Sequence, residues 1–248
     1  MATLFISDLH LDPRRPAITD LFLEFLKGRA SSAEALYILG DLFEAWIGDD
    51  DDGELGQRVS TALQALRQRG VPVYLLHGNR DFLLGERFAT ASGATLLPES
   101  LVVECQGTPT LIMHGDTLCT DDVKYQTFRA QVRSPEWQAR LLALPLAQRR
   151  ALAQQLRHES QQAIRQKAAE ITDVNPHAVA RAMGEHGVRR LIHGHTHRPA
   201  IHEWTMDGEP AQRLVLGDWY EQGSVLCCAT EGCRLEKLPL GLASQTEE

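Results

Sequence analysis

Short apolar runs rich in β-formers alternate with helical stretches in the first third of the chain, and this rhythm constrains the fold more than any other feature. The runs at 3–10, 34–41 and 71–81 favour buried strands that end in polar residues. Between them, the stretches 17–29 and 54–69 place apolar residues at helical spacing. This strand–helix–strand order predicts a parallel or mixed sheet covered by helices.

The rest of the chain supplies further strand candidates. The runs at 110–116 and 189–197 also end in polar residues, and the stretch 176–186 before the second of them has a helical pattern. After Pro199 come short strand candidates near 200–206, 212–217, 224–230 and 233–238. These later strands predict a second sheet beside the first.

One segment, residues 123–170, breaks the rhythm, because it contains helix formers and no strand candidate. Pro135 and Pro145 punctuate it, each at a position suited to a helix start. We therefore expect a helical insertion in one α/β core formed by residues 1–122 and 171–240. The tail, residues 241–248, is expected to be disordered.

Composition narrows the class of protein. The chain has 248 residues, 43% of them apolar, and a formal net charge of −8, as in an ordinary globular protein. A uniformly acidic surface would repel DNA and cast doubt on a phosphate substrate. The N-terminus does not resemble a signal peptide, and no apolar window is long enough to span a membrane. Five cysteines without a C-x-x-C pair suit a reducing compartment better than a disulfide framework, so we expect a cytoplasmic protein.

Polar side chains follow five of the predicted strands. In an open α/β sheet, ligands bind outside the carboxyl ends of the strands, so loops far apart in sequence can converge there. Together the loops offer carboxylates, imidazoles and one amide, a set that suits Mn²⁺, Fe²⁺ or Zn²⁺ better than Ca²⁺ or Mg²⁺. The five junctions are Asp8-x-His10, Gly40-Asp41, Gly78-Asn79-Arg80-Asp81, His114-Gly115-Asp116 and Gly194-His195-Thr196-His197.

Each of these motifs taken singly has a simpler interpretation. An Asp-x-His pair is more often a capped turn, Gly-Asp usually marks a turn, and His114 alone could be a hydrogen-bonded core histidine. The agreement of five such motifs, each at a strand end and in one order, is what indicates a metal centre.

This order of motifs resembles the signature of the calcineurin-like metallophosphoesterases over nearly the whole chain. The resemblance implies a four-layer α/β/β/α sandwich of two mixed sheets with two metal ions at the strand ends. It also implies that the metals activate a water for in-line attack at phosphorus. By this resemblance, Asp41 bridges the two ions. The first ion is then held by Asp8, His10, Asp41 and His197, and the second by Asp41, Asn79, His114 and His195.

Arg80 departs from the superfamily pattern, in which a histidine that can protonate the leaving oxygen usually follows the Gly-Asn motif. Arginine cannot give up a proton near neutral pH, but it can hold a phosphate through two hydrogen bonds. A phosphate leaving group needs no protonation, so Arg80 favours a pyrophosphate bond as the substrate. The alternative is that another residue, such as His195, donates the proton.

Further stretches resemble the narrower family of UDP-2,3-diacylglucosamine pyrophosphatases, which act in lipid A biosynthesis in Gram-negative bacteria. The stretches are GDLFEAWIGDDD at 40–51, GNRDFLLG at 78–85, HGDTLCTDD at 114–122, and the helical insertion. The resemblance implies attack of water at the α-phosphorus, which releases UMP and 2,3-diacylglucosamine 1-phosphate. It also implies two Mn²⁺ ions per chain and a peripheral position on the cytoplasmic face of the inner membrane. We expect a monomer that binds no nucleic acid.

The same resemblance implies which residues act on the substrate. Catalytic roles fall on Asp41, Asn79, Arg80 and His195. Substrate contacts fall on Asn79, Arg80, Asp122, Ser160, Ile164, Lys167 and His195. The spacing of Ser160, Ile164 and Lys167 independently places these three on one helix face. Alternatively, Ile164 belongs to a core stripe, Lys167 extends to water, and Asp122 caps the following helix.

The insertion also fits a lipid substrate, because its leucines could line a chamber for two acyl chains and touch a membrane as an amphipathic lid. The simpler interpretation is that they pack on the core. Residues 123–170 carry nine Lys and Arg and three Glu, so their net charge is +6 and that of the remainder is −14. This division predicts a basic cap over an acidic metal site, and it removes the doubt about a phosphate substrate.

Two other functions fit the sequence less well. Another metallophosphoesterase, such as a nuclease or a cyclic-nucleotide phosphodiesterase, is disfavoured by Arg80 and the insertion. A scaffold that has lost catalysis is disfavoured because every expected ligand position is filled. The acidic run 49–52 is interpreted as a solvated loop, because the ligand set is complete without it.

Overall fold

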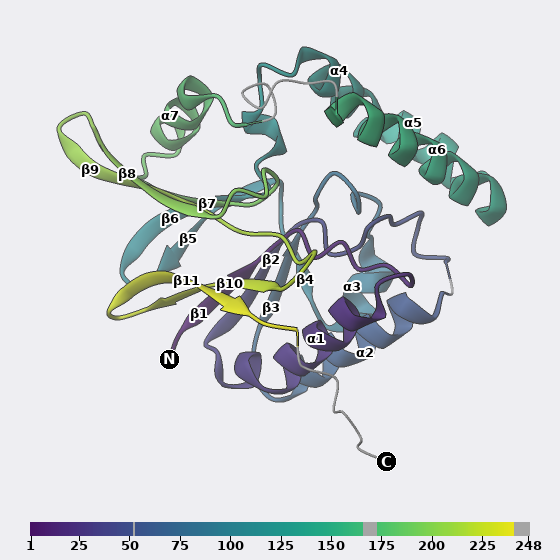
Figure 1. The fold of residues 1–248 in the computed structure, drawn as a ribbon, viewed down its shortest axis with the longest axis horizontal. Coiled ribbons are helices and arrows are strands. Elements are labelled where there is room, and N and C mark those ends of the chain that lie inside the picture. The colour runs from purple at the N-terminus through teal and green to yellow at the C-terminus, as the bar shows by residue number, and fades with distance from the viewer. Residues whose placement is uncertain (52, 166–172, 241–248) are drawn as a thin grey trace.

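The first sheet carries the N-terminal strand–helix alternation. The computed structural model describes residues 1–51, 53–165 and 173–240 (Figure 1). The strands of this sheet lie in the order β11-β10-β1-β2-β3-β4, and β1 to β4 run parallel to one another. Its strands are β1 Thr3–Ile6, β2 Ala35–Leu39, β3 Val73–Leu76, β4 Thr95–Leu96, β10 Gly223–Ala229 and β11 Gly232–Leu238.

The second sheet has the order β5-β6-β7-β9-β8. Strands β6, β7 and β9 are parallel, whereas β5 and β8 pair antiparallel at the two edges. The sheet is therefore mixed, as the first is. Its strands are β5 Ser100–Cys105, β6 Thr108–Met113, β7 Arg190–His193, β8 Ala200–Met206 and β9 Glu209–Val215.

The two sheets pack face to face and are covered by helices on their outer faces (Figure 1). Apolar side chains from both sheets, including Phe5, Leu39, Ile112 and Ile192, form one buried cluster between them. A second cluster packs three helices on the first sheet, and a third packs one helix on the second sheet. These helices are α1 Pro16–Lys27, α2 Glu54–Gln68 and α3 Glu86–Ser92 on the first sheet, and α7 Pro176–Glu185 on the second. The predicted four-layer α/β/β/α sandwich is confirmed.

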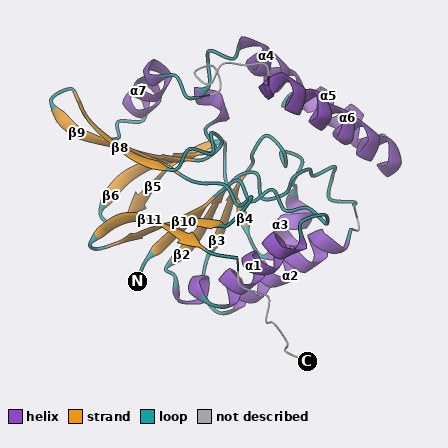
Figure 2. Ribbon diagram, viewed as in Figure 1, coloured by secondary structure: helices purple, strands orange, loops and turns teal. Residues whose placement is uncertain are grey.

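The insertion consists of helices α4 Val123–Val132, α5 Pro135–Leu142 and α6 Leu146–Arg165 (Figure 2). Proline starts α5, where Ser134 caps the helix by accepting a hydrogen bond from the Trp137 amide. Pro145 directly precedes α6, as its spacing suggested. Among described side chains, α4 buries only Val132 and α5 buries none, so the insertion has little apolar core of its own.

The structure corrects the sequence analysis at two places. Strands β4 and β5 and helix α3 were not predicted; β4 has only two residues and α3 only seven. The cysteines were expected to suit a reducing compartment better than a disulfide framework, but Cys228 and Cys233 form a disulfide. Because β10 and β11 pair antiparallel, these two residues lie opposite each other, a relation that a search for C-x-x-C cannot detect. None of the described helices combines the length and apolar character needed to cross a bilayer.

Candidate active site

The predicted site residues lie at one edge of the sandwich, where the parallel strands of both sheets end. Asp8, Asp41 and Asn79 follow β1, β2 and β3, and His114 and His195 follow β6 and β7. Because strands in each group are parallel, their carboxyl ends meet at the same edge. The topology thus gathers loops that are far apart in the sequence, such as those of Asp8 and His195, which are 187 positions apart.

The backbone at this edge is strained. Among the described residues, seven non-glycine residues have a positive φ, and five of them are predicted site residues. This conformation is uncommon outside glycine and costs of order 1 kcal/mol or more at each position. It persists only where surrounding structure holds it, and such positions cluster at functional sites. The five are Asp8, His10, Asp41, His195 and His197.

Asp8, His10 and His197 form one group of side chains. The Nε2 atom of His197 lies 3.4 Å from Asp8 Oδ1 and 3.3 Å from His10 Nε2. His10 Nε2 is also 4.0 Å from Asp8 Oδ1. Asp8 and His10 are buried, and the three ligand-type atoms all face one another. This arrangement concentrates lone pairs at one point.

Asp41, Asn79, His114 and His195 form the second group. Asn79 Oδ1 lies 3.0 Å from His114 Nε2 and 2.9 Å from His195 Nδ1. Asp41 Oδ2 is 3.8 Å from His114 Nε2 and 3.7 Å from His10 Nε2. Asp41 therefore stands between the two groups, which is the position that a bridging carboxylate requires.

Asp81 holds Asp41 in place, a role that the sequence analysis did not assign. It accepts hydrogen bonds from the backbone amides of Leu42 at 2.7 Å and Gly78 at 2.8 Å. A Cβ atom at Gly78 would overlap both the carboxylate and the amide nitrogen of Asp41, so only glycine fits there. The Arg80 amide donates to Asp41 Oδ1, which leaves Oδ2 facing the histidines.

Burial and neighbouring charges shift the pKa values of the site residues in different directions. Burial raises the pKa of Asp41 to about 7. Burial would lower the pKa of His114, but the carboxylates of Asp41, Asp8 and Asp116 raise it to about 9. Burial would raise the pKa of Asp8, but the adjacent imidazole of His197, through its proximity and its charge, holds that pKa well below the usual range. Burial lowers the pKa of His195 to about 3.

The donor set fits divalent cations. Asp8 Oδ1, which faces His197 in the first group, is buried without a hydrogen-bond partner among the described residues. Such atoms carry a desolvation penalty that a ligand can relieve. The surrounding atoms are carboxylate oxygens, imidazole nitrogens and one amide oxygen, the ligands that borderline divalent metals prefer. The predicted metal ligands are therefore all brought together.

The predicted substrate contacts are placed less completely. Arg80 donates from Nη2 to Ser160 Oγ on α6 at 3.4 Å, so these two residues meet. Asp122 accepts the Tyr125 amide and caps α4, and it also lines the cavity beside the site. The side chain of Ile164, on α6, and the whole of Lys167 lie outside the described residues.

A cavity of about 580 Å³ opens between this edge and the insertion. Its lining includes site residues such as Asp41, Asn79 and Arg80. It also includes apolar side chains of the insertion, namely Val132, Trp137, Leu141, Leu152 and Leu156. Some of the predicted leucines thus face a cavity and do not simply pack on the core.

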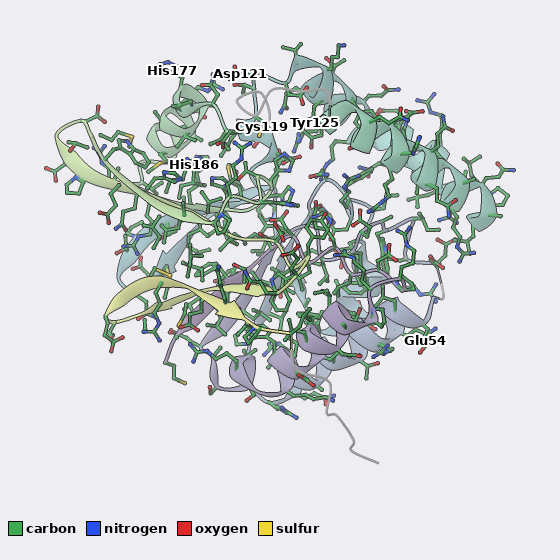
Figure 3. All side chains as sticks on the ribbon, in the orientation of Figure 1. Glu54, Cys119, Asp121, Tyr125, His177 and His186 are labelled. Atoms are coloured by element: carbon green, nitrogen blue, oxygen red, sulfur yellow. A yellow bond between two sulfur atoms is a disulfide. The ribbon has the colours of Figure 1, made fainter. Side chains whose placement is uncertain are left out.

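Several further residues, which the sequence did not predict as site residues, border this cavity. Tyr125, which Figure 3 shows where the insertion meets the core, donates its hydroxyl to Asp116 Oδ2 at 2.9 Å. Arg157, Glu44 and Tyr220 also line the cavity. These residues stand outside the strand-end motifs, and no local pattern in the sequence marks them.

Comparison with known proteins gives matches over most of the chain. The family model described as calcineurin-like phosphoesterase matches residues 1–199. The UDP-2,3-diacylglucosamine hydrolase of Enterobacter sp. (strain 638) is 56% identical over 96% of this chain and 100% of that protein. The enzyme of the same name from Xanthomonas axonopodis pv. citri (strain 306) is 54% identical over 97% and 100%. A solved archaeal phosphodiesterase has 14% identity and a TM-score of 0.48, over 96% of this chain and 100% of that one.

Proposed function

The chain belongs to the calcineurin-like phosphoesterase family, and within it to the UDP-2,3-diacylglucosamine hydrolases, and from this premise we propose its reaction. It hydrolyses the pyrophosphate bond of UDP-2,3-diacylglucosamine to UMP and 2,3-diacylglucosamine 1-phosphate, a step of lipid A biosynthesis. The observation that carries this proposal is the cavity that joins the His, Asp and Asn cluster to an apolar chamber. The polar cluster suits a pyrophosphate, and the apolar part of the lining suits acyl chains.

Two Mn²⁺ ions are the proposed cofactors. Asp8, His10, Asp41 and His197 would hold the first, and Asp41, Asn79, His114 and His195 the second. When bound, the cations supply Lewis-acid activation of water and neutralise charge on the phosphate oxygens. The position of Asp41 between the two groups and the unpartnered buried Oδ1 atom of Asp8 support this assignment.

Arg80 is proposed to bind and orient the pyrophosphate. Its backbone amide is fixed on Asp41 at 2.8 Å, so its side chain starts directly beside the cluster. A guanidinium offers paired donors to phosphate oxygens but no transferable proton. The leaving group, a sugar phosphate, departs without protonation because the pKa of a phosphate is about 6 or lower. Asn79 and His195 are also proposed to contact the attacked phosphate; Asn79 Oδ1 lies 2.9 Å from His195 Nδ1.

The insertion is proposed to act as the lid over the lipid. In this division, residues 1–122 and 171–240 form the catalytic core and residues 123–170 the lid, with 241–248 as a tail outside the described residues. The apolar lining contributed by α5 and α6 supports an acyl chamber. Asp122, Ser160, Ile164 and Lys167 remain proposed substrate contacts, and the approach of Arg80 to Ser160 supports the second of these.

A peripheral position on the cytoplasmic face of a Gram-negative inner membrane is part of the proposal, with the chain as a monomer. Exposed apolar side chains on the insertion support membrane contact, namely Val123 at 69%, Phe128 at 39% and Leu142 at 42%. Of these three, Phe128 also lines the cavity, so one exposed apolar side chain connects the surface of the insertion with the proposed acyl chamber.

The test is hydrolysis of UDP-2,3-diacylglucosamine by purified protein with Mn²⁺ in ¹⁸O-labelled water. We expect UMP that carries the label, together with unlabelled 2,3-diacylglucosamine 1-phosphate, because attack occurs at the α-phosphorus. Label in the sugar phosphate would refute the position of attack. Turnover of bis-p-nitrophenyl phosphate without turnover of the lipid would identify a different phosphodiesterase.

A further inference from the structure

Glu44 is a buried carboxylate that neither the strand-end motifs nor the proposed ligand sets include. It lies three residues after Asp41 and is 5% exposed. Its backbone amide donates to Leu11 O, so the loop that follows β2 is tied to the loop that carries His10. A buried carboxylate needs partners to offset its desolvation, and the position of these partners indicates its role.

The first partner is His10. The Nε2 atom of His10 faces the cluster, at 3.3 Å from His197 Nε2 and 3.7 Å from Asp41 Oδ2. Its Nδ1 atom points the other way and lies 3.4 Å from Glu44 Oε2. Both of these atoms are buried, and neither has a hydrogen-bond partner among the described residues. An imidazole that gives Nε2 to a cation carries its proton on Nδ1, where a carboxylate can orient the ring.

The second partner is Arg157 of α6, whose Nη1 atom pairs with Glu44 Oε1. One carboxylate therefore touches a proposed metal ligand with one oxygen and the insertion with the other. Arg15 approaches the same Oε2 atom at 3.6 Å and lies over the ring of Tyr220, which stacks on His10. Glu44 thus contacts the edge of the His10 ring at Nδ1, and Tyr220 packs on its face.

A second carboxylate–arginine pair between core and insertion offers a natural comparison. Asp50 pairs with Arg149, which is 3% exposed and also donates to Ile47 O at 2.7 Å. Asp50 contacts no proposed metal ligand, and its side chain is 53% exposed. If Glu44 served only to dock the insertion, replacing either carboxylate would have the same consequence at the metal site, namely none.

We propose that Glu44 is a positioning residue, which orients His10 through Nδ1 for the first metal ion and is itself held by Arg157 of the insertion. The inference rests on the proposed function, because it assumes that His10 is a metal ligand. A carboxylate behind a metal-bound histidine typically contributes about 10- to 100-fold to metal affinity or activity. Contact with Arg157 makes this contribution depend on how the insertion lies on the core.

The experiment measures Mn²⁺ affinity by titration of metal-free protein without substrate. We expect Glu44→Ala to weaken the tighter-bound ion by about 10-fold or more and Glu44→Gln to weaken it less, because the amide oxygen can still accept from Nδ1. Arg157→Met should weaken affinity by a smaller factor. The double variant Glu44→Ala/Arg157→Met should bind Mn²⁺ no more weakly than Glu44→Ala alone, because Arg157 acts through Glu44.

The matched control is Asp50→Asn, which should leave Mn²⁺ affinity unchanged. Thermal melting and circular dichroism of the metal-free variants check the fold, and Glu44→Gln remains usable if Glu44→Ala does not fold. Unchanged affinity in a folded Glu44→Ala or Glu44→Gln variant would overturn this inference alone. Wild-type protein that binds no divalent metal would overturn it together with the proposed function, whereas metal binding without lipid hydrolysis would overturn only the latter.

Discussion

The strand-end site and the helical insertion are held in place by different forces. Asp8, His10, Asp41 and His114 are almost fully buried, and they follow strands whose apolar side chains form the core. Helix α5, by contrast, buries no side chain, and α4 buries only Val132. Apolar burial therefore sets the geometry of the ligands, whereas the position of the insertion depends on polar contacts with the core.

Those polar contacts are mostly ion pairs from insertion arginines to core carboxylates. Because the partners are acidic loops of the core, part of the positive charge of the insertion is neutralised where it docks. The basic cap is therefore less available to an anionic membrane than its net charge of +6 suggested. The pairs are Arg129 with Asp116 and Glu99, Arg149 with Asp50, Arg150 with Asp51, and Arg157 with Glu44.

The acidic run after Gly48 forms a loop, as predicted, but its described residues are not merely solvated, because they also take part in this docking. Asp49 accepts hydrogen bonds from Trp46 Nε1 and from the amides of Gly85 and Phe88. Asp50 and Asp51 pair with α6, and residue 52 lies outside the described residues.

The largest effect on activity is expected from a substitution in the strand-end site. Asp41→Ala should lower turnover by more than about 100-fold and weaken binding of both metals, since a bridging ligand matters more than an outer partner. Steady-state kinetics and metal content after dialysis measure both effects. The control is Asp20→Asn, an exposed residue that pairs with Arg58. Activity of Asp41→Ala near that of the control would rule out the bridging role.

Acidification should weaken metal binding at the same site. Metals bind the deprotonated ligands. In the metal-free site, the neighbouring carboxylates raise the pKa of His114 to about 9, and burial raises the pKa of Asp41 to about 7, so both groups keep their protons to a higher pH than usual. Binding must therefore release protons, and apparent affinity should rise as pH rises from 6 to about 9, by up to about tenfold per unit for each proton released. Chelator competition across this range measures the slope. An affinity independent of pH would contradict it.

A smaller effect, confined to the lipid substrate, is expected from a substitution where the insertion contacts the core. Arg149→Met removes donors to Ile47 O, Leu144 O and Asp50. We expect KM for the lipid substrate to rise about tenfold, or about 1.4 kcal/mol, while hydrolysis of a small chromogenic diester stays within about twofold. Parallel kinetics with both substrates give the split. Equal loss with both substrates would show that the insertion supports the fold and not the lipid.

The smallest effect is expected for Arg150→Met, at the neighbouring pair with Asp51. The arginine is 51% exposed, and an exposed ion pair contributes at most about 1 kcal/mol. KM for the lipid should therefore change by less than about fivefold, and by less still at high salt, where the pair is already screened. A change as large as that of Arg149→Met would show that exposed charge, and not the buried contact with Ile47, places the insertion.

The sequence by itself determined the sandwich, the site edge and the group of ligand side chains. Strand and helix patterns are local, and parallel strands must bring their carboxyl ends to one edge, so Asp8, Asp41, Asn79, His114 and His195 had to converge. Backbone strain at five of the site residues agrees with that convergence, but it is invisible in the sequence.

Only the tertiary structure decided which side chains support these ligands. Asp81 under Asp41, Glu44 between His10 and Arg157, and the disulfide from Cys228 to Cys233 have no periodic signature. Each of these contacts depends on how two segments of the folded chain approach each other. The same holds for the pair of Arg149 and Asp50, which are 99 positions apart. Such contacts arise from packing and charge in three dimensions, because hydrophobic patterning specifies which face is buried but not which polar atoms meet across it.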